Sequence, residues 1–300
     1  MKRYGKLFEK IYVFGNLLKA SKAASENKRY RPDVSEYNYN LEKEILTISE
    51  SLKNKTWKPG EYHTFYITDP KKRLISAAPF RDRVVHHALC QVIEPLFETQ
   101  FIKHSYANRP GKGSHKALAQ CTKYCKNFNF VLKCDIRKYF PSMDHEILYR
   151  LITRRIKCPD TQWLIRNIID HSNPQEEWIS YFPGDDLFTP FERRHGIPIG
   201  NLTSQYFANI YLNGFDHFVK EILRCKAYIR YVDDFIIFSD DKKYLNELIP
   251  KLQTYLNSLR VTLHPLKCQV SDVRDGVSFL GWQVFAGHRR LKRKTGLRIQ

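Results

Sequence analysis

The sequence predicts an α+β fold that combines a short antiparallel sheet with helices. Two aromatic and β-branched runs, Tyr228–Val232 and Phe235–Phe238, flank Asp233-Asp234 as the strands of a tight hairpin would. Val131–Ile136 is a third short strand pattern, and it carries Asp135 near its end. Long segments between these strands place apolar residues at helical spacing, so helices should cover the sheet.

Composition indicates a globular chain with a polyanionic partner. The 300 residues are 42% hydrophobic and 27% charged, and 50 Lys and Arg against 31 Asp and Glu give a net charge of +19. Nucleic acid is the first partner class to expect and an anionic membrane surface the second. Seven scattered cysteines lack metal-ligand spacing and indicate reduced thiols of a cytosolic protein. No apolar run has transmembrane length, and Ile11–Leu18 is expected to be amphipathic helix rather than signal peptide.

Helical periodicity and turn residues predict the order of the elements. Residues 1–30 and 41–52 are expected to be helical, with Arg31-Pro32 breaking the first helix. Tyr62–Ile67 and Arg73–Ser76 form a predicted hairpin around Asp69–Lys72. Further helices are expected to begin at Phe80 and at Asp144, and to span 160–171 and 241–258. Two more have an expected capping residue: Ser114 caps the helix that runs to Lys126, and Asn201 caps the helix over Leu202–Leu223. Residues 172–195 are expected to be an irregular insertion, Val261–His264, Gln269–Val273 and Ser278–Phe285 to be strands, and 288–294 to be a mobile basic tail.

Asp135, Asp233 and Asp234 are the candidate catalytic residues. They are 233 − 135 = 98 residues apart, but strand pairing can bring them to one sheet edge. Three carboxylates there can bind two Mg²⁺ ions, or Mn²⁺, as nucleotidyl transfer requires. A solvent-facing acidic turn is the alternative for Asp233-Asp234. A second pair, Asp185-Asp186, lacks flanking strands and is the weaker candidate.

The sequence resembles a reverse transcriptase over about residues 59 to 285. The resemblance rests on blocks in family order: Arg73–Arg83, Ser105–Ser114, Asp135–Phe140, Gly196–Gln205, Tyr231–Asp234, Leu263–Lys267 and Phe279–Trp282. It implies a right-hand polymerase with a palm, an antiparallel sheet with helices on one face, and helical fingers. It assigns 1–58 to an N-terminal helical extension, 59–130 to the fingers, with 156–200 returning to the fingers or palm edge, 131–155 and 201–285 to the palm, and 286–300 to a basic tail or thumb remnant. The thumb is thus expected to be short or absent, which leaves open whether a partner grips the primer and template.

The resemblance also implies residue roles. Metal ligation falls to Asp135, Ile136, Asp233 and Asp234, and nucleotide binding to Lys72, Arg73, Phe140, Ile199, Gly200, Gln205 and Lys267. Nucleic-acid contacts fall to Arg109, Lys112, Phe279, Leu280 and Gly281. Arg73 and Lys72 would hold the triphosphate. Phe140 would exclude a ribose 2′-OH, with a core aromatic as the alternative, and Lys267 would protonate pyrophosphate, with a surface lysine as the alternative.

One block departs from the commonest pattern, Gln-Gly-x-x-x-Ser-Pro, because this chain has Ile199-Gly-Asn-Leu-Thr-Ser-Gln205. That departure resembles the reverse transcriptases of diversity-generating retroelements. Those bacterial or phage-encoded enzymes copy a template-repeat RNA into cDNA with frequent errors at adenine, in mutagenic retrohoming. The resemblance implies a cytoplasmic enzyme that uses template RNA, a primer and dNTPs, with an accessory variability determinant protein and no membrane.

Other interpretations of the sequence stay open. The chain could belong to another bacterial lineage of reverse transcriptases, such as retron, group II intron or abortive-infection enzymes. It could also be an inactive palm that binds RNA. A different two-metal enzyme, such as a nuclease or cyclase, would share the acids but not Arg73, Phe140 and the 196–205 block.

Overall fold

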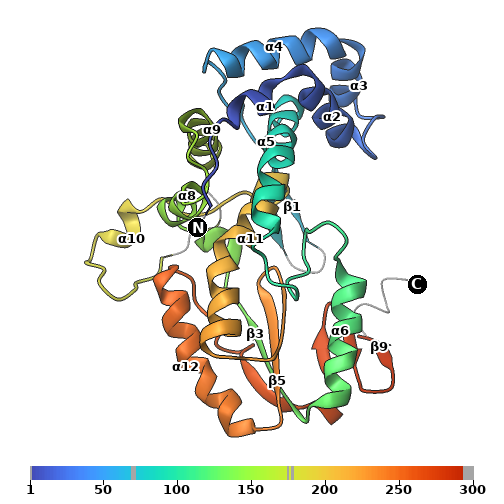
Figure 1. The fold of residues 1–300 in the computed structure, drawn as a ribbon, viewed down its shortest axis with the longest axis vertical. Coiled ribbons are helices and arrows are strands. Elements are labelled where there is room, and N and C mark those ends of the chain that lie inside the picture. Colours follow the sequence, from blue (N-terminus) through green and yellow to red (C-terminus); the bar gives the residue numbers. More distant parts are fainter. Residues whose placement is uncertain (1, 69–71, 174–175, 177–178, 293–300) are drawn as a thin grey trace. The chain divides into compact units, whose positions relative to one another are not determined.

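The computed structural model describes residues 2–68, 72–173, 176 and 179–292 (Figure 1). Two compact units share the chain: the first contains residues 1–100 and 140–211, the second residues 101–139 and 212–300. Most of the predicted turn Asp69–Lys72 and the end of the basic tail lie outside the described residues. In the parts that are described, no helix combines the length and apolar character needed to cross a membrane.

The first unit begins with four helices, α1 (Phe8–Tyr12), α2 (Phe14–Ser25), α3 (Pro32–Tyr39) and α4 (Leu41–Lys53), followed later by α5 (Phe80–Glu98). The prediction of one helix over residues 1–30 was wrong, because Val13 is extended and separates α1 from α2. Arg31-Pro32 does end the preceding segment, but Pro32 also opens α3, where a missing N–H costs nothing. The predicted helix over 41–52 is confirmed by α4. Helix α2 packs along α5, and Asn16 on α2 donates to the Ala88 carbonyl at 3.1 Å.

The rest of the first unit holds a hairpin and further helices. The predicted hairpin is confirmed as β1 (His63–Ile67) paired with β2 (Arg73–Ala77). The helices are α7 (Tyr139–Ser142), α8 (His145–Thr153), α9 (Pro159–Asp170), the short α10 (Thr189–Glu192) and α11 (Leu202–His217). The first residue of α7 and the residues of α11 from Leu212 onward are counted with the second unit. Helix α11 is shorter than predicted, because Phe218–Ile222 continue as a π-helix. The side chain of Asn201, predicted as its cap, binds the Ser76 carbonyl at 3.1 Å and the Ala78 amide at 3.3 Å.

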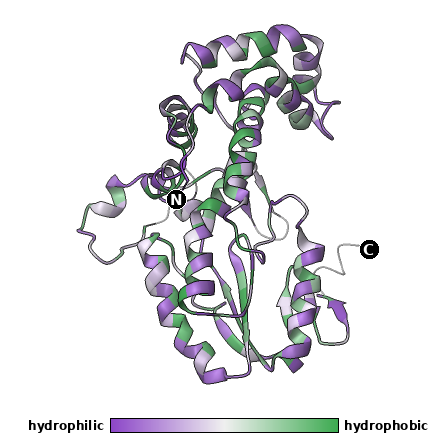
Figure 2. Cartoon of the chain, viewed as in Figure 1, coloured by the Kyte–Doolittle hydropathy of each residue, from purple (hydrophilic) through white to green (hydrophobic). Residues whose placement is uncertain are grey.

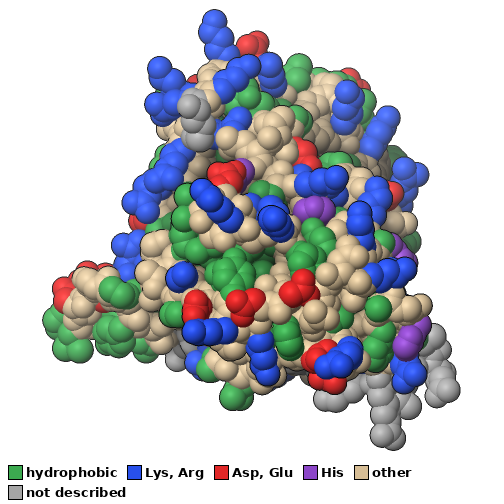
Figure 3. Space-filling model, turned by 60° about the horizontal axis from the view of Figure 1, so that its bottom comes forward, with side chains coloured by type: hydrophobic (Ala, Val, Ile, Leu, Met, Phe, Trp, Pro, Cys, Tyr) green, Lys and Arg blue, Asp and Glu red, His purple; other side chains and the backbone are tan. Residues whose placement is uncertain are grey.

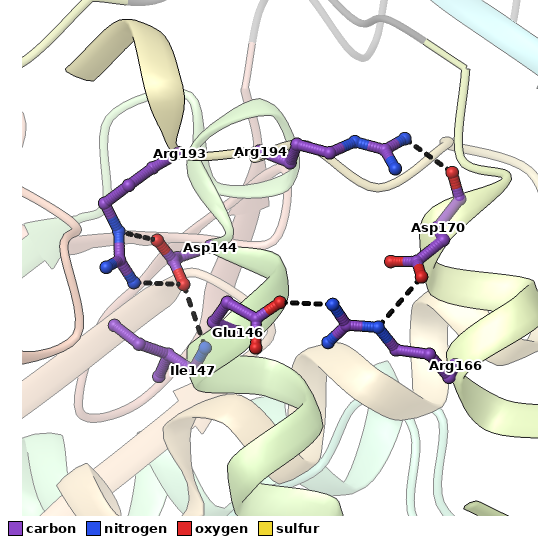
Figure 4. A network of polar contacts seen from close by, with 7 residues as sticks. All are labelled: Asp144, Glu146, Ile147, Arg166, Asp170, Arg193 and Arg194. Carbon is purple, nitrogen blue, oxygen red and sulfur yellow. Dashed lines mark hydrogen bonds and ion pairs between the residues drawn. The ribbon is translucent and has the colours of Figure 1, made fainter. Parts of the chain in front are cut away.

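A polar network connects α8, α9 and the segment after α10 (Figure 4). Buried Asp144 caps α8, because its carboxylate accepts from the Ile147 amide at 2.8 Å. Arg193 binds the same carboxylate through two nitrogens, at 2.5 and 2.8 Å. Arg166 bridges Glu146 on α8 and Asp170 on α9, at 2.5 and 2.8 Å. The network therefore fixes the far end of the largely irregular 172–195 insertion to two regular helices.

The second unit is built on a four-stranded sheet. Its strands are β3 (Phe130–Asp135), β4 (Ala227–Tyr231), β5 (Asp234–Ser239) and β6 (Gln269–Asp272), in the order β4-β5-β3-β6 with every pair antiparallel. Helix α12 (Lys242–Ser258) lies on one face, where Phe235 of β5 packs on Phe215, which in turn contacts Tyr255 of α12. Helix α6 (Ser114–Asn127) covers the other face and shares a core cluster with Val131, Ile236 and Phe238. The prediction of helices on one face of the sheet was therefore wrong. Strands β3 and β5 are accordingly hydrophobic along most of their length (Figure 2).

A second, small sheet completes this unit: β7 (Val277–Phe279), β8 (Trp282–Val284) and β9 (Arg289–Leu291). The single strand predicted over Ser278–Phe285 is thus two strands. The tail expected to be mobile instead contributes β9, which pairs with β8. The strand predicted over Val261–His264 is reduced to one bridge between Ile136 and Leu263. Ser114 does not cap α6, because Gly113 occupies the cap position and Ser114 is already helical.

Candidate active site

The hairpin that carries the acidic pair turns one residue earlier than the sequence predicts. Tyr231 of β4 pairs with Asp234 of β5, so the turn residues are Val232 and Asp233. Asp234 is therefore the first residue of β5 and not part of the turn. Val232 has φ = 57°, a left-handed conformation that β-branched residues rarely adopt.

The three candidate acids come together at one end of the sheet. Asp135, the last residue of β3, is paired directly with Asp234. The next residue along the chain, Ile136, donates its amide to the Asp233 carbonyl at 3.2 Å. Directly opposed residues of antiparallel strands point to the same sheet face, so the Asp135 and Asp234 side chains share a face.

Asp234 shows the electrostatic cost of this arrangement. Burial, together with the charges of Asp233 and Asp135, raises the pKa of Asp234 to about 6, although Lys133 opposes the shift. One of its carboxylate oxygens, Oδ1, is buried and has no hydrogen-bond partner among the described residues. A buried carboxylate oxygen without a partner is unfavourable, and a bound cation would relieve it.

Two lysines lie next to the acids, Lys133 on β3 itself and Lys267 in the segment before β6. The Lys133 ammonium lies 3.6 Å from Asp234 Oδ2 and donates to the Ser278 carbonyl at 2.7 Å. Lys267 forms an ion pair with Asp135. Sequence reasoning missed Lys133, although its position two residues before Asp135 places both side chains on one face of β3.

The donor set fits a metal that arrives with a phosphate ligand. Among the described residues, no group of three or more His, Cys, Asp or Glu is arranged to hold a metal ion by itself. Mg²⁺ commonly takes one or two carboxylates, keeps several waters and binds substrate phosphates. The paired Asp135 and Asp234, with a partnerless oxygen on Asp234, supply that number of carboxylates.

Arg109 and Lys112, predicted to contact nucleic acid, brace their own loop in the second unit. Arg109 donates to the Ile102 and Ser105 carbonyls at 2.7 and 2.8 Å. Lys112 donates to the Lys103 carbonyl at 2.9 Å. Arg109 and Lys112 thus stabilise the loop before α6, and their predicted contact with nucleic acid stays a prediction.

The predicted grip residues Phe279, Leu280 and Gly281 form the end of β7 and its turn into β8. Phe279 is fully buried in the core cluster. Leu280 and Gly281 both have positive φ, 48° and 84°, as the favoured two-residue hairpin turn requires. Phe279 therefore anchors the turn, and a grip on the primer stays a prediction.

The other predicted nucleotide-binding residues belong to the first unit. Arg73 is exposed at the start of β2, and the Lys72 ammonium lies 4.4 Å from the centre of the Tyr66 ring. Gln205 lies in the first turn of α11, where its backbone amide donates to the Asn201 backbone carbonyl at 3.3 Å.

Backbone hydrogen bonds join three of the predicted blocks in this unit. The Ile199 carbonyl accepts from the Ser76 amide at 3.1 Å, and the Phe140 carbonyl accepts from the Ile197 amide at 3.0 Å. Gly200 has φ = 116° and sits against Ile75, where a Cβ would lie 3.2 Å from the Ile75 methyl. The residues around Phe140, Ile199 and Ser76, far apart in sequence, are therefore neighbours in space.

A sequence model of the family described as reverse transcriptase (RNA-dependent DNA polymerase) matches residues 58–284. The chain belongs to the reverse transcriptase family. The matched range contains every candidate site residue named above and agrees with the range of the blocks recognised in the sequence. The match supports RNA-directed DNA polymerase activity, a reaction for which reverse transcriptases generally use divalent metal ions.

Three relatives illustrate the similarity. Protein YkfC of Escherichia coli K12 is 24% identical over 295 residues, which cover 84% of this chain and 72% of that protein. The uncharacterized 91 kDa protein in the cob intron of Schizosaccharomyces pombe is 23% identical over 300 residues, covering 80% of this chain and 36% of its own length. The group II intron-encoded protein LtrA of Lactococcus lactis is 27% identical over 184 residues, covering 60% of this chain and 29% of its own. The match thus spans most of YkfC but far less than two thirds of either intron protein.

Proposed function

We propose that this reverse transcriptase copies an RNA template into cDNA by two-metal nucleotidyl transfer, with Asp135, Asp233 and Asp234 as the metal-binding acids. The direct pairing of Asp135 with Asp234 carries the proposal, because it brings together carboxylates that are far apart in sequence. When bound, one Mg²⁺ ion activates the primer 3′-hydroxyl and the other neutralises the leaving pyrophosphate; Mn²⁺ could substitute. In this assignment the sheet of the second unit is the palm, and β1, β2 and α5 belong to the fingers.

Other residues would bind and orient the substrates. Arg73 and Lys72 hold the incoming triphosphate, and the ring of Phe140 excludes a ribose 2′-OH. Lys267, which pairs with Asp135 in this structure, would move a proton to the leaving pyrophosphate. Lys and Arg side chains spread over the face in Figure 3 would attract template and primer, as the +19 charge suggests.

Primer extension on a defined RNA template tests this function. Asp135→Ala and Asp233→Ala should abolish cDNA synthesis and leave RNA affinity near that of the wild type, because the acids supply chemistry and the basic residues supply affinity. Asp275→Ala, an exposed acid of the same unit, is the matched control and should extend normally. Wild-type extension rates in Asp135→Ala would remove the assignment.

We further infer that the enzyme is the mutagenic polymerase of a diversity-generating retroelement. The support is Ile199 beside Gly200, together with Gln205, at the block where most reverse transcriptases carry Gln and Pro. An Ile side chain has no hydrogen-bonding group, so it can hold a template base only by packing. A cytoplasmic bacterial or phage setting and an accessory variability determinant protein belong to this proposal. The similarity to LtrA favours a second candidate, a group II intron-like reverse transcriptase.

Sequencing of the cDNA product distinguishes the two candidates. Substitutions are counted by template base for the wild type and for Ile199→Gln. Errors concentrated at adenine support the retroelement type, and uniformly low error favours the intron-like type. High adenine error that persists in Ile199→Gln would keep the type but move its cause to another residue, Arg73 first.

A further inference from the structure

A fully buried ion pair lies next to the acidic hairpin. Arg230 on β4 and Asp216 near the end of α11 both have 0% of their side chains exposed. Arg230 Nε donates to Asp216 Oδ1 at 2.7 Å and its Nη2 donates to Oδ2 at 2.6 Å, a bidentate pair, while the Tyr228 hydroxyl also donates to Oδ1 at 2.7 Å. Burying two charges is costly, and an apolar pair of similar volume often stabilises a fold as well. A role beyond stability is therefore worth seeking.

The third nitrogen of Arg230 reaches the turn itself. Nη1 donates to the Val232 carbonyl at 3.0 Å. Val232 is the residue held at φ = 57°, and the next residue is Asp233. A β-branched residue persists in this conformation only where its surroundings fix it. The Ile136 amide fixes the other side of the turn through the Asp233 carbonyl.

Arg230 acts on the acids through the backbone and not by contact. It pairs with Phe235, whereas its neighbour Tyr231 pairs with Asp234. Side chains alternate between the faces of a strand, so the Arg230 guanidinium lies on the sheet face opposite to Asp135 and Asp234. The backbone of Arg230 is itself fixed, because its amide donates to the His104 carbonyl and its carbonyl accepts from the Tyr106 amide, each at 3.0 Å.

We propose that Arg230, oriented by Asp216, is a positioning residue: it holds the left-handed turn at Val232 and so sets the direction in which Asp233 presents its carboxylate. The inference rests on the proposed function, since it takes Asp233 as a metal-binding acid. Asp216 holds the Arg230 guanidinium in one orientation through Nε and Nη2, and Nη1 then stabilises the turn by its hydrogen bond to the Val232 carbonyl. Without that hydrogen bond, Val232 relaxes toward negative φ and Asp233 moves away from Asp135.

Arg230→Lys is the first test, because it keeps the buried charge but replaces a planar fork by a single ammonium. It should fold with a cooperative thermal transition. Because small displacements of a catalytic group cost about 10- to 100-fold in rate, kcat should fall by about that much with little change in KM for dNTP. The metal-free variant should also bind Mn²⁺ more weakly, which electron paramagnetic resonance measures without any turnover.

Rescue by the turn residue separates positioning from fold support. Glycine adopts positive φ without a penalty, so Val232→Gly should restore much of the kcat and Mn²⁺ affinity lost in Arg230→Lys. Val232→Ala is the matched control: it removes the same methyl groups but keeps the Cβ that disfavours positive φ, so it should not rescue. Each double variant is compared with its own Val232 single variant.

The possible outcomes are distinct. Wild-type kcat and Mn²⁺ affinity in Arg230→Lys would overturn the inference, and so would a loss that Val232→Gly does not repair. If Arg230→Lys fails to fold, Asp216→Asn releases the fork while keeping the side-chain shape, and the same rescue applies. An inactive wild type, or an active Asp233→Ala, would instead remove the proposed function, while the Mn²⁺ measurement still reports on the turn.

Discussion

Asp135 and Asp234 face each other as directly paired residues at the end of the antiparallel strands β3 and β5. Their carboxylates share a sheet face, and Asp234 keeps a buried oxygen without a partner among the described residues. The two carboxylates repel each other, and Lys133 and Lys267 offset this only in part, because the pKa of Asp234 stays raised. The site should therefore respond measurably to pH, to metal and to changes in the residues around it.

Protons should compete with metal at Asp234. Since burial raises its pKa to about 6, the Mg²⁺ concentration for half-maximal extension should fall as pH rises from about 5 to about 7 and then level off. In the metal-free protein, Asp234 keeps its proton up to about pH 6 in the folded state but only up to its ordinary pKa of 3.8 in the unfolded state. The contribution of Asp234 to the free energy of unfolding therefore falls as pH rises between those two values. Thermal unfolding of the wild type and Asp234→Asn across this range measures the second effect. An identical pH dependence in both proteins would contradict it.

Lys133 should set the pH range in which the enzyme works. Its ammonium opposes the upward shift of the Asp234 pKa, so Lys133→Met should raise that pKa further and move the acidic limb of the pH–rate profile to higher pH. Lys133→Arg keeps the charge and is the matched control. The readout is the extension rate against pH at one fixed Mg²⁺ concentration below saturation, where protons still compete with the metal, and coincident profiles for all three proteins would refute the role.

Gly200 should not tolerate a side chain. Because its φ is 116° and a Cβ there would lie 3.2 Å from the Ile75 methyl, Gly200→Ala should destabilise the folded state by about 1–3 kcal/mol. Gly15→Ala is a control of opposite sign, because a Cβ added at that helical position would meet no neighbouring segment within 4 Å and alanine favours helix by about 0.5–1 kcal/mol. Urea unfolding of both variants gives the comparison, and a neutral Gly200→Ala would be the contrary result.

Phe140 should govern sugar selection. Removing the ring in Phe140→Ala should let ribonucleotides enter, because space opens for the 2′-OH. The measurement is the ratio of deoxyribonucleotide to ribonucleotide incorporation on one primer, with Phe140→Tyr, which keeps the ring, as control. An unchanged ratio in Phe140→Ala would leave the half-buried ring as packing only.

RNA affinity should depend steeply on salt. The +19 charge implies that binding releases counterions, so the logarithm of the association constant should fall linearly with the logarithm of salt concentration. Fluorescence anisotropy with a labelled RNA between low and physiological salt measures the slope. A flat response would indicate a mode of binding that does not depend on phosphate contacts.

Sequence patterns predicted the elements well where hydrophobic period and local turn signals agree. Helices α4, α5 and α12, the β1–β2 hairpin and the strands that carry Asp135 and Asp234 were all expected. The errors occurred at the ends of elements. Pro32 was taken as a break but also starts α3. Asp234 was assigned to the turn because it stands between two aromatic and β-branched runs, but it is the first residue of β5.

The remaining features depend on contacts that no local pattern contains. The turn at Val232 runs against the conformational preference of its residue, and buried Arg230 fixes it from two residues away. Cys134 and Cys268, whose sulfurs lie 3.0 Å apart, are 268 − 134 = 134 residues apart in sequence. Strand β9 forms in a tail whose charge suggested mobility, because β8 offers it an edge to pair with.

The pairing of β3 restricts how the length of this chain can change in evolution. All six residues of β3 pair with β5, and four of them also pair with β6, so the strand has no unpaired edge along most of its length. A single inserted or deleted residue inside it would exchange the two faces, turning Asp135 toward α12 and Cys134 toward α6. Insertions and deletions should therefore be purged from this strand in a population under selection. They should accumulate in connections such as residues 179–188, where exposed Leu187 and Phe188 belong to no helix or strand.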